Sequence, residues 1–197
     1  SESNADIDAA LLGIPAGDAA YRERLLKWAR GVDVQDVDDD GDITEVRHEM
    51  GDPMHSTPFV LNYAATDTAP ARSLVFVGTN EGFLHAIDTD SGGEVYGLIP
   101  PDLLPNLDVF YRNENGRERP YGLDGPVGGW FDDANANLVV DPGEKAYVYV
   151  GMRRGGRDYY ALDVSDAENP ELAWVVQGGS GDFAELGQSW SRPVRTR

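Results

Sequence analysis

The chain has 197 residues, of which 41% are hydrophobic and 10% aromatic, a composition typical of a globular protein with a buried core. Asp and Glu number 35 against 16 Lys and Arg, and the formal charge of -19 argues against a broad nucleic-acid or anionic-membrane surface, which needs a positive field. The absence of cysteine excludes disulfides, thiolate metal sites and cysteine nucleophiles.

The N-terminal residues 1–17 are expected to be an irregular lead-in without the basic and apolar regions of a signal peptide. If the protein is secreted, its signal is expected upstream of this sequence. Residues 18–30 are predicted to form one short amphipathic helix, because Asp18 suits the N-cap and Gly31 suits the end. No apolar run approaches the roughly 18 residues that a membrane span needs, so no membrane insertion is expected.

An acidic loop over residues 33–47 follows the helix and matches the first half of the EF-hand calcium loop. Carboxylates occupy positions 1, 3 and 5, glycine occupies position 6, and an apolar residue occupies position 8. Calcium takes hard oxygen ligands around a sharply turned backbone, and the glycine permits that turn. The lead-in, the helix and this loop make up a first region, residues 1–50. The predicted calcium ligands here are Asp36, Asp38, Asp40, Asp42 (through its carbonyl), Thr44 and Glu45.

This loop departs from the EF-hand pattern at position 12, where Arg47 replaces the bidentate glutamate. Glu45 or Asp33 could supply the missing carboxylate by folding back. The alternative is a solvated acidic loop without metal, because runs of aspartate are common in a chain this acidic.

From about residue 57 onward, short β-type runs are separated by Gly, Asn, Asp and Pro, and these runs repeat. Pro58, Pro126 and Pro193 recur at intervals of 68 and 67 residues. Each unit offers four strands with matching phrases at matching places. The expected strands lie at 58–61, 73–78, 83–88 and 94–99 in the first unit, and at 126–127, 146–151, 158–163 and 171–176 in the second.

Four short antiparallel strands repeated at a fixed period predict an all-β fold, a β-propeller with quinoprotein-like four-stranded blades. A sandwich or barrel would explain the strands but not their repetition in phase. Region 51–197 is then a partial propeller, with one blade at 58–100, one at 124–177 and the first strand of the next at 189–197. Two blades and one strand cannot close a ring. We therefore expect the remaining blades to come from the same longer chain or from another chain.

A second calcium-type loop is predicted between the first two strands of the second blade. Oxygen-bearing side chains fall at positions 1, 3, 5, 9 and 12. Position 6 is Leu138 where the pattern has glycine, so an Asn-rich turn without metal is an equally open interpretation. The predicted ligands of this loop are Asp133, Asn135, Asn137, Asp141 and Glu144.

No catalytic residue is predicted. The three histidines lack a partner at the spacing of a zinc site. Ser180 lacks the strand-to-helix context of a nucleophile elbow. The basic run Met152–Arg157 is interpreted as a hairpin loop whose arginines contact carboxylates of the same protein.

Several phrases of the sequence stand in a recognisable order: Gly51-Asp-Pro-Met-His-Ser56, Gly78-Thr-Asn-Glu-Gly82, Ile99-Pro-Pro101, Gly122-Leu-Asp-Gly-Pro126, Gly151-Met-Arg-Arg-Gly-Gly156 and Tyr159-Tyr-Ala-Leu-Asp163. Together they resemble the C-terminal propeller of the PilY/PilC family. The resemblance implies a large exported protein of the pilus or outer cell surface that supports type IV pilus assembly, opposes retraction and takes part in adhesion and twitching motility. It also implies calcium as the cofactor, and other pilus components, minor pilins or a host surface as partners.

The leading hypothesis is therefore a non-enzymatic, calcium-binding, pilus-associated module. One alternative is a quinoprotein-like dehydrogenase, because similar four-stranded blades also host pyrroloquinoline quinone enzymes. A second alternative is a purely structural, metal-free surface protein. The family's blade loop usually has the acidic-Gly pattern from which this chain departs at Leu138.

Overall fold

The computed structural model describes residues 2–196 and divides the chain into two compact units. The first unit contains the residues up to Gly51 together with Pro100–Pro120, and the second contains Asp52–Ile99 and the residues from Tyr121 onward. Most of the secondary structure is β, as the sequence predicts, and all the strands belong to the second unit. In the described part of the chain, no helix is long and apolar enough to span a membrane.

The predicted N-terminal helix is present in the first unit as α1 (Ala19–Ala29). The side chain of Asp18 caps it by accepting a hydrogen bond of 2.8 Å from the backbone N–H of Tyr21. The helix ends before Gly31, whose φ of +83° is a conformation that favours glycine. Its buried face consists of Leu25, Leu26 and Trp28.

The expectation of a single helix was wrong, because Pro101–Asn106 forms a 3₁₀ helix that leads into α2 (Leu107–Arg112). Apolar side chains at helical spacing become buried along this segment, and Asn113 ends it in the left-handed conformation with φ +44°. No helix or strand is predicted from the sequence for this segment, which lies between the two predicted blades. Its buried residues are Leu103, Leu104, Leu107 and Phe110.

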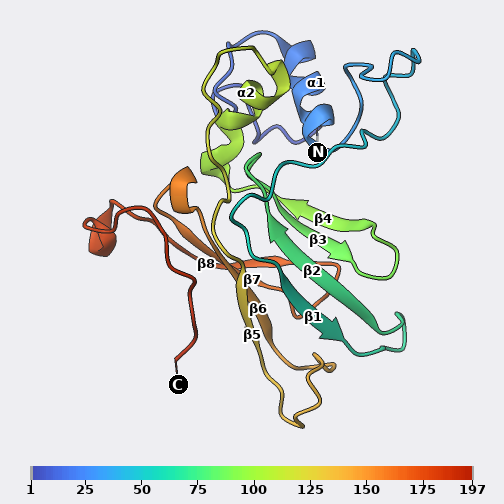
Figure 1. Cartoon of the computed structure of the whole chain (residues 1–197), viewed down its shortest axis with the longest axis vertical. Coiled ribbons are helices and arrows are strands. Elements are labelled where there is room, and N and C mark those ends of the chain that lie inside the picture. The colour runs from blue at the N-terminus through green and yellow to red at the C-terminus, as the bar shows by residue number, and fades with distance from the viewer. Residues whose placement is uncertain (1, 197) are drawn as a thin grey trace. The chain divides into compact units, whose positions relative to one another are not determined.

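The second unit contains two antiparallel sheets of four strands each, with the strands in chain order (Figure 1). The eight strands predicted for the two complete units are present, except that β5 starts two residues after Pro126, because proline has no N–H to give to a ladder. One sheet consists of β1 (Phe59–Tyr63), β2 (Arg72–Gly78), β3 (Leu84–Asp88) and β4 (Glu94–Leu98), and the other of β5 (Gly128–Phe131), β6 (Ala146–Gly151), β7 (Tyr159–Asp163) and β8 (Glu171–Val176).

The two sheets pack face to face within this unit. The ring of Phe59 lies so close to Gly129 that a Cβ placed on this glycine would lie 2.2 Å from the ring, so only glycine fits there. Tyr63 at the end of β1 donates a buried hydrogen bond of 2.9 Å to the carbonyl of Val164 after β7. Each sheet therefore buries one face against the other, as neighbouring propeller blades do.

The basic run after β6 contacts carboxylates of the same unit, as the sequence analysis expected. Arg153 donates a hydrogen bond of 3.3 Å to one oxygen of the buried Asp124 side chain. Nδ1 of His55 lies 2.6 Å from the other oxygen. Since these three residues come from the segments around β1, β5 and β6, the contacts fasten the two sheets together at this end.

The expected first strand of a third blade, residues 189–197, does not form over its described part, residues 189–196. Arg197 lies outside the described residues. Pro193 cannot donate to a ladder, and Ser189 is instead fastened by accepting a hydrogen bond of 2.8 Å from the N–H of Met152. The guanidinium of Arg195 lies 3.5 Å from the centroid of the Trp130 ring, so the segment lies on the second sheet through its side chains.

Candidate metal centres

The first acidic loop is closed at its base as a short hairpin. Val32 and Val46 form an isolated antiparallel bridge. Next to it, the N–H of Asp33 donates a hydrogen bond of 3.0 Å to the carbonyl of Glu45. The base therefore brings residues from the two ends of the loop together.

Arg47, which stands where an EF-hand has its last ligand, belongs to this base. Its N–H donates a 2.6 Å hydrogen bond to the carbonyl of Gly31. Its guanidinium lies 4.1 Å from the centroid of the Trp28 ring in α1. The departure from the EF-hand pattern at position 12 thus has a structural role, which is to fix the loop to the helix.

The turn of the loop has the hydrogen bonds that the EF-hand pattern predicts. Oδ1 of Asp36 accepts a bond of 3.0 Å from the N–H of Gly41, whose φ is +87°. Oδ1 of Asp40 accepts a bond of 2.7 Å from the N–H of Asp42. The side chains at positions 1 and 5 therefore hold the backbone in a tight curve.

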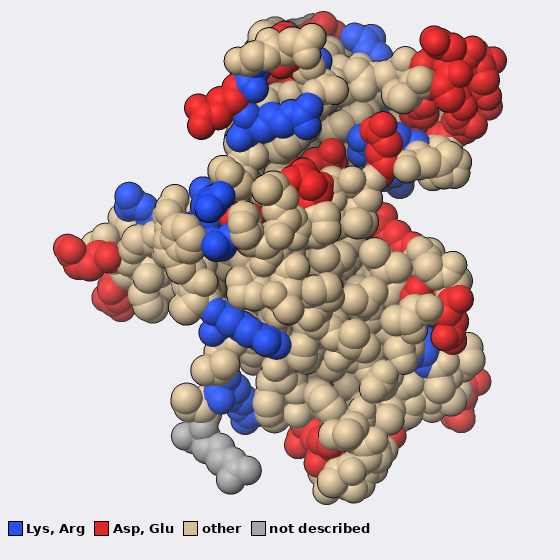
Figure 2. All heavy atoms as spheres, in the orientation of Figure 1, with Lys and Arg blue, Asp and Glu red and all other residues tan. Residues whose placement is uncertain are grey.

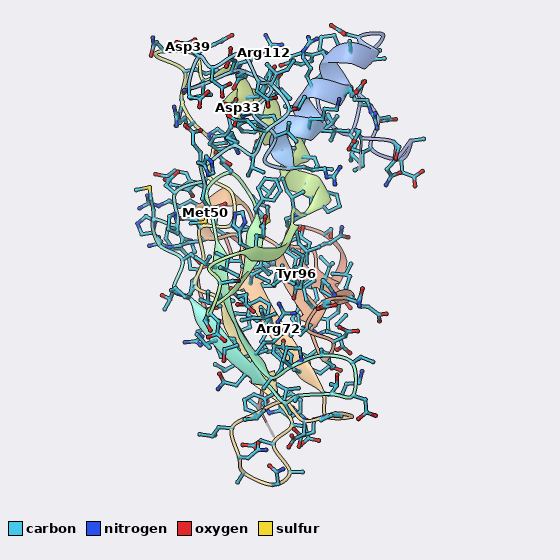
Figure 3. All side chains as sticks on the ribbon, turned by 90° about the vertical axis from the view of Figure 1, so that its right-hand side faces the viewer. Asp33, Asp39, Met50, Arg72, Tyr96 and Arg112 are labelled. Atoms are coloured by element: carbon cyan, nitrogen blue, oxygen red, sulfur yellow. The ribbon has the colours of Figure 1, made fainter. Side chains whose placement is uncertain are left out.

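Two overlapping groups of carboxylates meet in this loop. The oxygens of Asp36, Asp38 and Asp40 lie within 4.8 Å of one another, and so do those of Asp33, Asp38 and Glu45. Figure 3 shows Asp39 at the tip of the loop and Asp33 nearer its base. Asp38 belongs to both groups, so it is the residue on which a shared cation would depend most.

Asp33, which the sequence offered beside Glu45 as a replacement for the position-12 ligand, is 4% exposed and lies in the same group as Glu45. The signal in the sequence was the pair of valines that flank the acidic run, because residues just inside a hairpin base face one another. Both fold-back carboxylates are therefore close enough to serve one ion.

Asp42 and Thr44 lie outside these two groups. Oδ1 of Asp42 accepts a 2.9 Å hydrogen bond from the N–H of Thr44 and a 2.6 Å bond from its hydroxyl. These bonds lower the pKa of Asp42. Both hydrogen bonds go to the side chain of Asp42. Neither uses its backbone carbonyl, which is the calcium ligand predicted from the sequence.

The crowding of like charges perturbs Glu45. Its pKa is raised, chiefly by the charge of Asp40, with burial and the charges of Asp38, Asp42 and Asp33 adding to the effect. Figure 2 shows the acidic side chains of the loop gathered in one red cluster at the upper right. A bound cation would relieve this repulsion.

The second loop, between β5 and β6, has the same backbone turn. The N–H of Leu138 at position 6 donates to a carboxylate oxygen of Asp133 at position 1, at 3.2 Å. Positions 4 and 6 have φ of +58° and +61° here (Ala136 and Leu138), compared with +60° and +87° in the first loop (Asp39 and Gly41). Leu138 therefore adopts a left-handed conformation at a cost of about 1 kcal/mol.

The polar side chains of the second loop are hydrogen-bonded to one another. The amide groups of Asn135 and Asn137 both donate to Oδ2 of Asp141, at 2.7 and 2.8 Å. The carboxylate of Glu144 accepts from the N–H of Ala134 at 3.0 Å and from that of Asp141 at 2.9 Å. All five predicted ligands therefore belong to one hydrogen-bond network. In this network the amide groups of Asn135 and Asn137 make some of the contacts to carboxylate oxygen that a bound cation would make.

Position 8 distinguishes the two loops further. Val140 in the second loop is 4% exposed, and its N–H donates a 2.7 Å hydrogen bond to Asn62 of β1. Its carbonyl accepts a 3.1 Å bond from Ala64. The corresponding Ile43 in the first loop is 55% exposed. The second loop is thus fixed to the neighbouring sheet at its middle. The first is fixed at its base and by Gln35, whose side-chain amide donates a 3.0 Å hydrogen bond to the carbonyl of Tyr111.

Comparison with known proteins gives consistent relatives. The type IV pilus biogenesis factor PilY1 homolog of Xylella fastidiosa is 31% identical over 132 residues, covering 66% of this chain and 10% of that protein. The type IV pilus biogenesis factor PilY1 of Pseudomonas aeruginosa is 32% identical over 127 residues, covering 62% of this chain and 10% of that protein. This chain therefore spans about a tenth of the length of these curated relatives. No protein-family model matches it.

Two further similarities are more partial. The crystal structure of the Pseudomonas aeruginosa PilY1 C-terminal domain is 28% identical in sequence, with a TM-score of 0.40, over 62% of this chain and 22% of that one. The lanthanide-dependent methanol dehydrogenase of Methylorubrum extorquens is 36% identical over 74 residues, which is 38% of this chain and 12% of that enzyme.

Proposed function

This chain belongs to the PilY1 family, and on that premise we propose that it is a non-enzymatic, calcium-binding module of a type IV pilus protein. Its two sheets are blades of a β-propeller whose remaining blades come from the same longer chain or from another chain. The module works outside the cell, on the pilus or the outer cell surface. There it supports pilus assembly, control of retraction and adhesion, with other pilus components, minor pilins or a host surface as partners.

The observation that carries the calcium assignment is the convergence of carboxylates on Asp38. Calcium takes six to eight oxygen ligands in a flexible geometry, and the first loop offers five carboxylates and the carbonyl of Asp42 around one tight turn. The second loop is a weaker candidate, because its ligands already satisfy one another through Asn135 and Asn137.

Binding of calcium would supply the positive charge that the first loop lacks. The side chains of Asp36 and Asp40 already shape the turn, so ordering the remaining carboxylates costs little backbone rearrangement. A loop whose carboxylates are ordered by a cation can bias a partner-binding surface, because the cation favours only the ordered state.

The double variant Asp38→Ala plus Asp40→Ala tests this assignment in the isolated protein. We expect calcium affinity to fall at least about 10-fold, because each charge-assisted contact contributes about 1.5–3 kcal/mol. Asp39→Ala is the matched control, since Asp39 lies in the same loop but in neither carboxylate group. Unchanged calcium affinity and unchanged thermal stability in the double variant would remove the first loop from the account.

The role in pili is tested in the cell. Deleting the gene that encodes this chain should reduce the number of surface pili and the twitching zone, and reintroducing the gene should restore both. Normal piliation and twitching in the deletion strain would contradict the proposed role, whatever the calcium result.

The second candidate function, a quinoprotein-like dehydrogenase, is favoured only by the partial similarity to methanol dehydrogenase. We expect no quinone absorbance in the purified protein and none after incubation with pyrroloquinoline quinone, metal ions and subsequent gel filtration. Retained quinone absorbance would support the enzyme in place of the pilus module. A metal-free structural role remains as the conclusion if neither loop binds calcium.

A further inference from the structure

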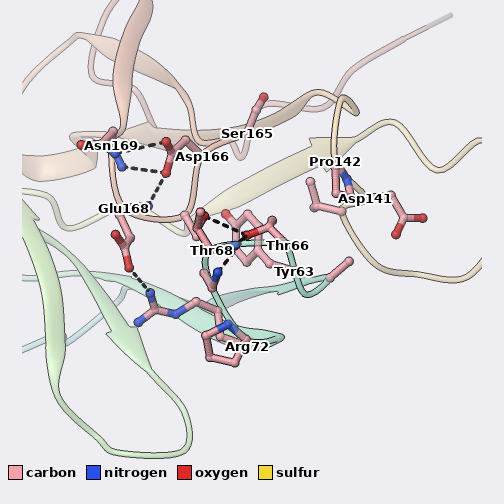
Figure 4. A pocket seen from close by; sticks show the side chains of 15 residues that line it. Tyr63, Thr66, Thr68, Arg72, Asp141, Pro142, Ser165, Asp166, Glu168 and Asn169 are labelled. Carbon is pink, nitrogen blue, oxygen red and sulfur yellow. Dashed lines mark hydrogen bonds and ion pairs between the residues drawn. The ribbon is translucent and has the colours of Figure 1, made fainter.

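A cavity of about 460 Å³ lies in the second unit where connections from both sheets meet. Its walls come from the β1–β2 connection, the end of the second calcium-type loop and the β7–β8 connection, with Tyr63 between them (Figure 4). The volume falls within the range of about 300–1,000 Å³ that ligand pockets have. This site could not be predicted from the sequence, because its walls are far apart along the chain.

The charges around the cavity are predominantly negative. Arg72 on the wall donates to Glu168 at 2.9 Å and to Asp88 at 3.2 Å. Asp141 and Asp166 also line the cavity. Three carboxylates thus share the lining with one guanidinium, which leaves two negative charges in excess. Asp88 lies outside the lining and pairs with the same guanidinium.

Two of these carboxylates are held in the charged form. Hydrogen bonds from the backbone and side chain of Ser91 lower the pKa of Asp88. The pKa of Asp166 is lowered first by a backbone hydrogen bond from Glu168. The pKa of Tyr96 is raised chiefly by burial, and the charge of Asp166 adds to this effect. The cavity therefore favours a cationic occupant.

A single metal ion does not suit this arrangement. Across residues 2–196, the groups of three or more His, Cys, Asp or Glu side chains close enough to share an ion both lie in the first acidic loop. An anion does not suit it either, because Arg72 already has two carboxylate partners. The occupant that remains is an extended side chain with a positive end.

The walls also fit the stem of such a side chain. Pro70 and Pro142 give the cavity apolar surface beside its carboxylates, and lysine and arginine bury their aliphatic stems while keeping the charged end hydrated or paired. Glu168 can change partners at little cost, because its side chain is 62% exposed and exposed ion pairs contribute only about 0–1 kcal/mol.

We propose that this cavity receives a lysine or arginine side chain of a partner protein, with Glu168 and Asp141 accepting its positive end. The site is separate from the first acidic loop; it shares Val140, Asp141 and Pro142 with the second, and of these three Asp141 is a predicted calcium ligand. It requires no calcium, so its test is made with chelator present and its outcome is independent of the calcium assignment.

The probe is the blocked peptide acetyl-Gly-Gly-Lys-Gly-Gly-amide, with norleucine in place of lysine as the uncharged control. Titration followed by backbone NMR should give saturable shifts at residues 64–72, 140–142 and 165–169 with the lysine peptide. We expect the norleucine peptide to give no saturable shifts. The same titration with methyl glucoside asks whether the cavity takes a neutral sugar instead.

Glu168→Gln should weaken binding of the lysine peptide about two- to fivefold, because it removes one partly exposed charge. Glu168→Lys should weaken it at least about tenfold by reversing the charge. Glu185→Gln removes the same charge from an exposed position outside the cavity and should leave binding unchanged.

Shifts spread over the acidic surface, or equal weakening by Glu168→Gln and Glu185→Gln, would show unspecific attraction and overturn the proposal. Stronger cavity shifts with methyl glucoside than with the peptide would overturn it in favour of a sugar. Circular dichroism of each variant confirms that a loss of binding does not come from a loss of fold.

Discussion

The two acidic loops share a backbone turn and differ in what stabilises it. Both have left-handed residues at positions 4 and 6, and in both the carboxylate at position 1 accepts a hydrogen bond from the N–H at position 6. The first loop gathers several carboxylates around Asp38. The second places two asparagine amides against Asp141. The same turn is therefore combined with crowded carboxylates in one loop and with amide donors in the other.

The difference also concerns anchoring. Position 8 of the second loop is part of a sheet interface, whereas position 8 of the first is open to solvent. A loop fixed at its middle stays ordered through its neighbours, and a loop whose middle lies in solvent depends more on its own contacts. Dependence on calcium should therefore be greater in the first loop.

Position 8 gives the largest expected difference in stability. Val140→Ala should lower the free energy of unfolding by about 2 kcal/mol, because it removes two buried methyl groups and leaves a cavity. The matched change Ile43→Ala in the first loop should stay within about 0.5 kcal/mol, as exposed substitutions do. Urea unfolding monitored by circular dichroism measures both values. Equal losses in the two variants would contradict the difference in anchoring.

The amide network of the second loop should give the second-largest effect on stability. Asn135→Asp removes a donor to Asp141 and adds a negative charge, so the calcium-free protein should lose about 1 kcal/mol of stability. Calcium should restore more stability to this variant than to the parent. Thermal unfolding in chelator and in calcium measures the difference. A variant as stable as the parent in chelator would show that the amide network does not hold the loop.

The left-handed backbone conformation of Leu138 should give a smaller effect on stability. Leu138→Gly should raise stability by about 0.5 kcal/mol, because relief of the conformation outweighs the added freedom of the unfolded chain. Ala134→Gly, in the same loop but at a position without positive φ, should lower stability by about 0.5 kcal/mol. Destabilisation by both changes would show that Leu138 is not strained.

The smallest effect concerns pH in the first loop. Because the pKa of Glu45 is raised above its ordinary 4.5, this residue takes up a proton at a higher pH than a free glutamate does. The folded, calcium-free protein binds that proton more tightly than the unfolded chain, so the contribution of Glu45 to stability falls as pH rises through this window. Calcium competes with the proton, so calcium affinity should decline as pH falls from 7 to 5. In Glu45→Gln this early decline should be absent, and its persistence would assign it to another group.

Much of the fold could be predicted, because the repeated strand phrases and their spacing reflect the period of the blades. The 3₁₀ helix and α2 could not be predicted. Pro101 and Pro105 do not indicate a helix in the sequence, and the burial of this segment depends on tertiary packing. The prediction of a strand beginning at Ser189 was wrong. The described part of that segment is held by side-chain contacts and does not pair with a strand through backbone hydrogen bonds.

The candidate site was only partly accessible to sequence reasoning. The acidic spacing predicted which residues form the turns, because ligand positions in such loops are local. It could not predict that Leu138 takes the conformation of a glycine, since the hydrogen bonds of the surrounding loop impose it. The cavity of Arg72 and Glu168 was missed because its walls come together only in the folded unit.

The central claim, that calcium binds this chain through its acidic loops and first through the loop around Asp38, is tested most directly by calorimetric titration of metal-stripped protein. Calcium should bind saturably and raise the melting temperature, and magnesium at the same concentrations should do neither, because its smaller ion needs a stricter octahedral geometry. Absence of saturable binding, or equal binding of magnesium, would contradict the claim.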